Sequence, residues 1–316
     1  MSFFVNGLLT PVIIDDYLPT KNGKPCFARS RDEELWVCLL EKAWAKLYGA
    51  YARMEGGDPS FAAIHLNGSP ATTIWHDQFE TEDDIEGLWT KIVEADGKGY
   101  EMMCGTKGQG EEKMGKGMIS GHAYSLIAAK EVETEEGQVR LLKLRNPWGQ
   151  GEWTGDWSDE SDKWTDELKE LMGMNDKNDG IFHMSFDDYL KNYLTTSICV
   201  TVDSNEYHFS RCLFDYGANN VNTKKFKFTL TEDVPSTDSF TISVAQQGQR
   251  LRYERAKVNK FAPSAIKIKL FKEGADCWIE GAYQRAFNNW LEVDKEDLDE
   301  GTYIIEVSVP QWNAVA

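Results

Sequence analysis

The stretch HAYSLIAAKEVETEEGQVRLLKLRNPWG, residues 122–149, decides how the first part of this chain folds. Two strand-like runs, 122–132 and 139–146, flank the polar turn ETEEGQ, a pattern that predicts an antiparallel hairpin. His122 begins the first run and Asn146 ends the second. A hairpin brings its two ends together, with strands about 4.8 Å apart. We therefore expect the His122 imidazole to lie within hydrogen-bond reach of the Asn146 amide.

An amide oxygen that faces His122 would fix the tautomer and the orientation of the imidazole. This is the role of the third member in a nucleophile–base–orienter triad. Trp148, two residues further on, is expected to cover the His122–Asn146 bond and to keep water away, because a drier bond is electrostatically stronger. The alternative is a hydrogen bond that only stabilises the hairpin and takes no part in catalysis.

Composition narrows the classes of protein. The chain has 316 residues, which suggests two domains, and 41% of them are hydrophobic, which is enough for sizeable cores. The formal net charge is −18. Because so acidic a chain should repel phosphate backbones, we expect no nucleic-acid partner. Cations such as Ca²⁺ become plausible partners of such a charge.

The location of the protein is inferred from what the sequence lacks. There is no run of 18 apolar residues, so no transmembrane segment is expected, and the start MSFFVNGLLTPVIIDDY does not resemble a signal peptide. The six cysteines show no CxxC spacing. We therefore expect a reducing, cytoplasmic location, with neither a disulfide framework nor a zinc site.

Helices and loops can be assigned along the first 200 residues. Apolar spacing predicts a helix over 30–54, with Ser30 and Glu33 as a capping box, and a second helix over 81–99. Residues 55–80 are expected to form a loop. The Gly-rich segment TKGQGEEKMGKGM, 106–118, is expected to be a flexible loop, and it has no phosphate-binding spacing.

The pattern changes near residue 205, where short strands begin to dominate. In AIKIKL, the residues Ile266, Ile268 and Leu270 alternate with Lys267 and Lys269, which indicates one buried and one solvated face. Regular turns between such strands predict an antiparallel β-sandwich.

Several of these stretches together resemble the calpain family, cytosolic Ca²⁺-dependent cysteine peptidases with a papain-like core. SGHAYSLIAAK at 120–130 and LLKLRNPWGQGEWTGDWSD at 141–159 are similar to the His and Asn motifs of that family. Segments 11–30, 34–51 and 179–203 resemble further parts of the second half of its protease core. The resemblance covers residues 10–203, and the strand-rich remainder is similar to the family's C2-like domain in position and texture.

The resemblance implies an α+β fold, with residues 1–203 as the calpain protease-core subdomain that carries His and Asn. Residues 206–316 would form the C2-like β-sandwich. It also implies that His122 is the general base and Asn146 its orienter, with Trp148 shielding them.

The family's nucleophilic Cys lies in a QGxLGDCWLLA-like segment of an N-terminal half-domain, and this chain has no such segment. None of its six cysteines is expected to substitute, and Cys104 is expected in a flexible loop. The chain is therefore predicted to be inactive alone. It could be a degenerate homologue, part of an active enzyme, or a polypeptide that takes its nucleophile from a partner supplying the missing half-domain.

The acidic loop carries a second implication of the resemblance. Glu152, Asp159 and Asp179 match positions at which calpains place a Ca²⁺ site, although Ile181 stands where the family has another carboxylate. Fewer charged ligands make such a site weaker. The alternative is an ordinary solvated acidic loop.

Two functions from different classes remain open. The first is a calpain-like cysteine endopeptidase polypeptide that acts on protein or peptide. The second is a non-catalytic, Ca²⁺-responsive scaffold, or pseudoprotease, whose sandwich binds protein or acidic lipid. The basic strand faces that would serve the second function hold Lys224, Lys225, Lys227, Lys267 and Lys269, although alternating Lys is also common solubilising surface.

Overall fold

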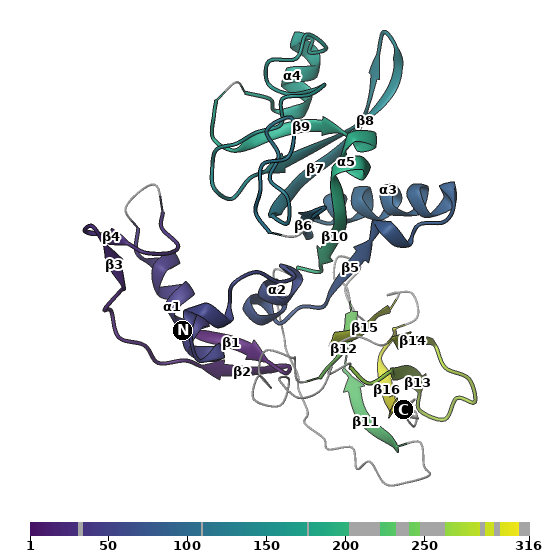
Figure 1. The fold of residues 1–316 in the computed structure, drawn as a ribbon. Coiled ribbons are helices and arrows are strands. Elements are labelled where there is room, and N and C mark those ends of the chain that lie inside the picture. Colours follow the sequence, from purple (N-terminus) through teal and green to yellow (C-terminus); the bar gives the residue numbers. More distant parts are fainter. Residues whose placement is uncertain are drawn as a thin grey trace, which may run out of the picture. The chain divides into compact units, whose positions relative to one another are not determined.

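The structure is a computed structural model of the 316-residue chain (Figure 1). It describes residues 1–30, 34–108, 110–175, 177–201, 222–231, 240–246, 263–284, 288–293 and 298–309. The chain divides into two compact units. Unit 1 contains residues 1–57, 65–70 and 202–316, and unit 2 contains residues 58–64 and 71–201.

Unit 2 is built on a six-stranded antiparallel sheet whose strand order is β5-β10-β6-β7-β8-β9. The strands in chain order are β5 (Ala71–Trp75), β6 (Glu101–Thr106), β7 (Ala123–Thr134), β8 (Gly137–Arg145), β9 (Ile181–Ser185) and β10 (Tyr193–Cys199). The largest hydrophobic cluster of this unit joins the sheet to helices α3 (Glu82–Gly97) and α5 (Phe186–Asn192), so both helices pack on the sheet.

The predicted hairpin is confirmed. Strands β7 and β8 pair antiparallel from Ser125 opposite Arg145 to Thr134 opposite Gly137, with one register shift between Leu126 and Ala128. The hairpin lies inside the sheet, because β6 pairs with β7 and β9 pairs with β8. Residues just outside its open end are therefore held by neighbouring strands on both sides.

The second predicted helix is confirmed as α3, and its start follows from local chemistry. The Thr81 side chain accepts from the backbone N–H of Asp84, and the Asp84 carboxylate accepts from the backbone N–H of Thr81. This capping box satisfies donors that a helix start leaves free. The buried face carries Leu88, Trp89 and Ile92.

Two expectations for the segment between residues 55 and 106 are wrong. Residues 55–80 contain a helix, α2 (Ser60–Asn67), and the edge strand β5 in place of a loop. Cys104 does not lie in a flexible loop but in β6, where it is fully buried. The run EMMCGT alternates buried Met102, Cys104 and Thr106 with less buried residues, and this period of two is the strand signal.

The N-terminal part of unit 1 has two short ribbons and helix α1 (Trp36–Tyr48). The ribbons pair β1 (Ser2–Val5) with β2 (Leu8–Pro11) and β3 (Thr20–Lys21) with β4 (Lys24–Pro25). The apolar face of α1 packs on β1, since Ala43 and Trp44 share a cluster with Phe3.

The predicted bounds of this helix, 30–54, are too wide. Leu35 is the N-cap and provides no side-chain cap, while Glu33, half of the predicted capping box, lies outside the described residues. The helix ends at Gly49, whose φ of 96° lies in the left-handed region that glycine tolerates. Leu35 and Trp36 were expected on the apolar face, but each is 57% exposed.

The C-terminal part of unit 1 is rich in strands. A four-stranded sheet has the order β11-β16-β13-β14, and β12 pairs with β15. Their bounds are β11 (Asn222–Leu230), β12 (Phe240–Ala245), β13 (Ile266–Lys272), β14 (Glu280–Gln284), β15 (Asn288–Val293) and β16 (Gly301–Val309). Both sheets contribute to one hydrophobic cluster, so they pack against each other.

The alternation predicted for β13 is confirmed, since Ile266, Ile268 and Leu270 are buried while Lys267 is exposed. Two of the short strands expected after residue 205, FSRCLF at 209–214 and RLRYE at 250–254, lie outside the described residues. The predicted α+β class, a calpain-type core followed by a β-rich region, is confirmed. The C2-like character of that region and the domain bounds 1–203 and 206–316 remain predictions.

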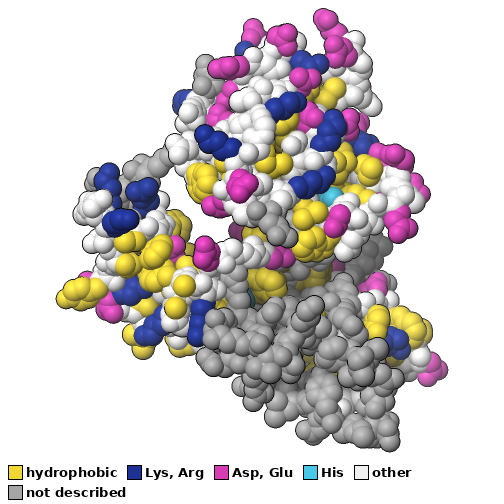
Figure 2. All heavy atoms as spheres, viewed as in Figure 1, with side chains coloured by type: hydrophobic (Ala, Val, Ile, Leu, Met, Phe, Trp, Pro, Cys, Tyr) yellow, Lys and Arg dark blue, Asp and Glu magenta, His cyan; other side chains and the backbone are white. Residues whose placement is uncertain are grey.

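Figure 2 shows that the described surface carries side chains of both charges on the face drawn. There, acidic side chains are interspersed with Lys and Arg over the described part of the molecule. Among the described residues, no helix is long and apolar enough to cross a membrane.

Two of the buried histidines of unit 2, His76 and His183, are held neutral. His76 is 8% exposed, its Nδ1 lies 3.1 Å from the Tyr193 carbonyl oxygen, and its Nε2 lies 2.8 Å from the Thr196 hydroxyl. Burial lowers the pKa of His76 to about 4. Burial, helped by the charge of Lys143, also lowers the pKa of His183 to about 4.

These shifts predict that the fold loses stability as the pH falls from about 6.5 towards 4, because the unfolded chain binds more protons in that range. Between about pH 7 and pH 5 the loss should approach about 2 kcal/mol per buried histidine. Urea unfolding of the wild type and of the double variant His76→Gln/His183→Gln measures it. An equally steep pH dependence in the double variant would show that other groups cause the loss.

Candidate active site

His122 is positioned by the backbone at the open end of the β7–β8 hairpin. It lies directly before β7, and the Thr106 side chain and backbone hold it on both sides. The Thr106 N–H donates to the His122 carbonyl at 3.0 Å, and the His122 N–H donates to Thr106 Oγ1 at 3.0 Å. The last residue of β6 thus fixes the point from which the imidazole projects.

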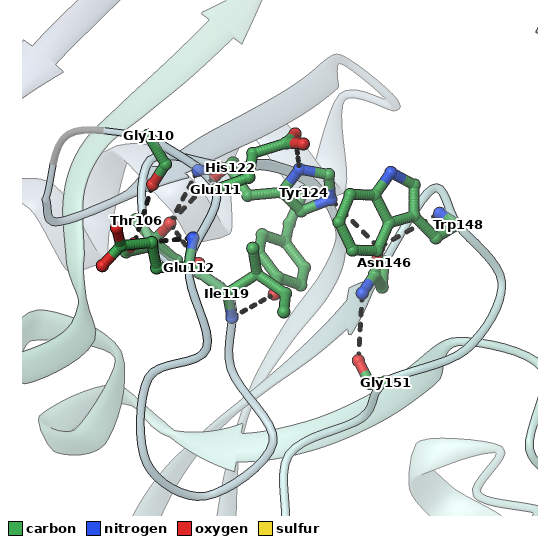
Figure 3. Close-up of polar contacts among 11 residues, drawn as sticks. Thr106, Gly110, Glu111, Glu112, Ile119, His122, Tyr124, Asn146, Trp148 and Gly151 are labelled. Atoms are coloured by element: carbon green, nitrogen blue, oxygen red, sulfur yellow. Dashed lines mark hydrogen bonds and ion pairs between the residues drawn. The ribbon is translucent and has the colours of Figure 1, made fainter. Parts of the chain in front are cut away.

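His122 and Asn146 meet as the hairpin predicted. His122 Nε2 lies 3.1 Å from Asn146 Oδ1 (Figure 3). The histidine is 6% exposed and the asparagine 0% exposed. A hydrogen bond at this distance between buried groups is shielded from competing water.

The partners of Asn146 decide which of its amide atoms faces the imidazole. The Trp148 backbone N–H can only donate, and it lies 3.1 Å from one end of the amide, which is therefore Oδ1. The other end lies 3.0 Å from the Gly151 carbonyl oxygen, which can only accept, so that end is Nδ2. Since Oδ1 faces His122, the Nε2 of His122 must carry a proton and donate.

Two aromatic rings enclose the imidazole. The Trp148 ring lies against it with centroids 4.5 Å apart, and the Tyr124 ring meets it edge-on at 5.0 Å. Trp148 is itself 49% exposed, so its outer face meets solvent while its inner face covers His122. This is the covering position expected for Trp148.

Glycines make the turn after β8 possible. Gly180 has a φ of 90°, and a Cβ there would lie 2.7 Å from the Asn146 carbonyl oxygen and 2.7 Å from the Gly149 Cα. That close approach lets the Asn146 N–H donate to the Gly180 carbonyl at 2.8 Å. The 179–180 turn therefore packs directly on the turn that carries Asn146.

The family model described as "Calpain family cysteine protease" matches residues 1–200. This chain belongs to the calpain family. The match includes β7, β8 and the turn after β8, and thus the His122–Asn146 pair.

Individual relatives agree. Calpain clp-1 of Caenorhabditis elegans is 36% identical over 209 residues, which is 62% of this chain and 26% of the relative. The calpain-type cysteine protease DEK1 of Arabidopsis thaliana is 36% identical over 204 residues, covering 62% of this chain and 9% of the relative. The calpain-1 catalytic subunit of Sus scrofa is 36% identical over 205 residues, covering 61% and 27%. The chain thus matches about a quarter or less of each of these relatives.

The three carboxylates predicted to bind calcium do not form a metal site. Glu152 Oε1 accepts from the Gly180 N–H at 2.7 Å, and Asp179 Oδ1 accepts from the Ile181 N–H at 3.0 Å. Asp159 is half-buried on the same loop as Glu152. Across the described part of the chain, no group of three or more His, Cys, Asp or Glu side chains could hold a metal ion. Glu152 and Asp179 act here as backbone acceptors, and in this structure the three carboxylates are not gathered around a common point.

The cysteines of unit 2 are not placed as nucleophiles. Cys104 and Cys199 are both 0% exposed, and burial raises the pKa of both thiols, that of Cys199 to about 12. The thiolate is the nucleophile, so neither side chain suits the role. In unit 1, Cys38 is buried and Cys26 and Cys277 are exposed, while Cys212 lies outside the described residues.

One residue of the site was missed in the sequence. Glu111 Oε1 lies 2.8 Å from His122 Nδ1, the ring nitrogen opposite the one that Asn146 holds. The only signal for this contact in the sequence is the pair Glu111 and Glu112 in the glycine-rich segment that precedes His122. Such a segment predicts an ordinary loop and does not indicate which side chain would reach the imidazole.

The calcium prediction can be tested by calorimetry. Because the Glu152 and Asp179 carboxylates already accept backbone hydrogen bonds, titration of Ca²⁺ into the chain should give the same heats for the wild type and for Asp159→Ala. A saturable heat in the wild type that Asp159→Ala abolishes would show that the loop rearranges into the predicted site.

Proposed function

We propose that this chain supplies the His–Asn half of the active site of a calpain-type cysteine endopeptidase. The observation that carries the proposal is the buried hydrogen bond from His122 Nε2 to Asn146 Oδ1, with its direction set by Trp148 and Gly151. Membership of the calpain family supports it.

The chemistry follows from the proton positions. Asn146 holds the proton on Nε2, which leaves Nδ1 as the nitrogen that can take a proton from a cysteine thiol. The thiolate then attacks the peptide carbonyl, and the Nδ1 proton goes to the leaving amine. In the second half of the reaction, Nδ1 accepts a proton from the water that attacks the acyl-enzyme, and the thiolate is released.

Asn146 and Trp148 serve this base without touching the substrate bond. Asn146 keeps the ring from rotating and stabilises the imidazolium, since its carbonyl dipole faces the Nε2 proton. Trp148 excludes water from that bond and leaves the opposite side of the ring for the reaction.

The cysteine would come from a segment like the nucleophile half-domain of the family, in the same or a partner polypeptide, and substrates would be proteins or peptides. We propose residues 206–316 as a C2-like sandwich after a core at 1–203, and a cytoplasmic location. Calcium dependence is proposed only as a family property, because the described residues contain no gathered group of cation ligands.

A chimera tests the proposal. Residues 1–200 replace the matching segment of calpain clp-1, and the chimera is expected to cleave casein under conditions in which calpain clp-1 does. His122→Ala in the chimera should lower kcat/KM by at least about a thousandfold, and Asn146→Ala should cause a smaller loss. The 316-residue chain alone should leave casein intact.

Glu133→Gln is the matched control, because this exposed residue lies at the turn end of the same hairpin, opposite Gln138. Circular dichroism establishes that each variant is folded. A folded chimera without activity, or one whose activity survives His122→Ala, would contradict the proposal and favour the scaffold function.

A further inference from the structure

The contact between Glu111 and His122 has no role in the reaction just described. Glu111 Oε1 lies 2.8 Å from His122 Nδ1, and its side chain is 52% exposed (Figure 3). Because Nε2 donates to Asn146, Nδ1 is the nitrogen that a thiol must reach. A carboxylate is an acceptor, so this contact requires a proton on Nδ1 as well. In the arrangement described, His122 is therefore an imidazolium between two oxygen acceptors.

A hydrogen-bonded ribbon holds Glu111 in this position. Its two limbs lead away from Thr106 and back to His122. The Gly121 N–H donates to the Lys107 carbonyl at 3.2 Å, and the Ser120 N–H donates to the Glu112 carbonyl at 2.8 Å. Ser120 Oγ donates to the Gly110 carbonyl at 2.8 Å. These bonds flank Glu111 on both sides, so the described residues of the predicted flexible loop, 106–108 and 110–118, have hydrogen bonds that aim the carboxylate.

Close contact of two glycines sets the path of the ribbon. A Cβ on Gly121, whose φ is 55°, would lie 2.9 Å from both the backbone nitrogen and the carbonyl oxygen of Gly110. Any larger residue at 121 would push the limb that carries Glu111 away from His122. The close approach of Gly110 and Gly121 therefore holds Glu111 where its carboxylate reaches Nδ1 of His122.

The surroundings of His122 identify Glu111 as the charged group of the contact. The elements packed on the ring contribute Tyr124 from β7, Asn146 and Trp148 from the turn after β8, and Glu111 from the ribbon. Burial raises the pKa of Tyr124, which keeps its hydroxyl neutral. Of these four residues, Glu111 alone carries a charge.

We propose that Glu111 occupies the place of the nucleophile on His122 and acts as an autoinhibitory contact. This inference rests on the proposed function, because the place matters only if His122 is the base. Activation is an exchange of anions, in which a cysteine thiolate replaces the Glu111 carboxylate and the imidazolium keeps both protons. The thiol proton goes to solvent. The Glu111 side of this ion pair is half exposed to solvent, which weakens the pair, so an incoming cysteine can displace the carboxylate.

The contact is tested on the 316-residue chain labelled with ¹⁵N-histidine, with the His122 signals assigned through a His122→Asn variant. If the contact holds, the wild type should show a proton on each ring nitrogen, because each nitrogen faces an oxygen acceptor. In Glu111→Gln the amide can donate to Nδ1, so Nδ1 should change to an unprotonated nitrogen while Nε2 keeps its proton.

Glu112→Gln is the matched control, since this exposed neighbour points away from the ring in Figure 3. It should leave the spectrum as in the wild type. An unprotonated Nδ1 in the wild type, or equal changes in both variants, would overturn the contact.

The chimera with calpain clp-1 separates this inference from the proposed function. There Glu111→Gln should raise kcat/KM by roughly fivefold, the effect of removing one half-exposed ion pair, and Glu112→Gln should not. Equal rates in an active chimera would overturn the inhibitory role. A chimera that is inactive both with Glu111 and with Glu111→Gln would count against the proposed function. The nitrogen spectra would still decide whether Glu111 holds Nδ1.

Discussion

The side-chain amide of Asn146 makes three hydrogen bonds, and the rest of the site is arranged around them. Its oxygen accepts from His122 Nε2 and from the Trp148 N–H, and its nitrogen donates to the Gly151 carbonyl. A fully buried amide that lost these partners would be costly, so the amide can adopt one orientation only. That orientation sets the protonated nitrogen of His122 and thereby the nitrogen that is available for chemistry.

The sheet makes this interaction possible, because it fixes where the hairpin ends. Strands β6 and β9 pair with the two hairpin strands and hold them in place from outside. Thr106 then anchors the His122 backbone, and Gly180 accepts from the Asn146 backbone. The acidic loop takes part in the same network, since Glu152 accepts from Gly180. The Glu152 carboxylate therefore stabilises the 179–180 turn, on which the Asn146 backbone packs.

The parts of this arrangement that depend on short-range pattern could be predicted from the sequence. Two apolar runs and a polar turn predicted the hairpin, and a hairpin leaves little freedom for its ends, so His122 and Asn146 were paired correctly. The alternation of β13 was equally direct. The start of α1 was predicted wrongly. Apolar spacing extended the predicted helix to residues before Trp36, but the helix begins at Trp36 after Leu35, which forms no side-chain cap.

Contacts made by irregular segments could not be predicted in the same way. Glu111 reaches His122 through a ribbon whose path depends on Gly110 meeting Gly121, and such backbone contacts leave no periodic signal. The carboxylates Glu152 and Asp179 matched a family pattern, but local backbone N–H groups compete for them. Spacing in the sequence records neither kind of contact.

The most direct test of the central claim is to follow the Nε2 proton of His122 by ¹⁵N-resolved NMR in the wild type and in Asn146→Ala. Asn192→Ala serves as the control, since the Asn192 amide bonds only locally to the Asp188 carbonyl. The account predicts an Nε2 proton protected from exchange in the wild type and in the control. In Asn146→Ala it predicts that this protection and the close contact between the His122 and Trp148 rings are both lost. An unchanged Nε2 proton in Asn146→Ala would mean that Asn146 does not orient the base.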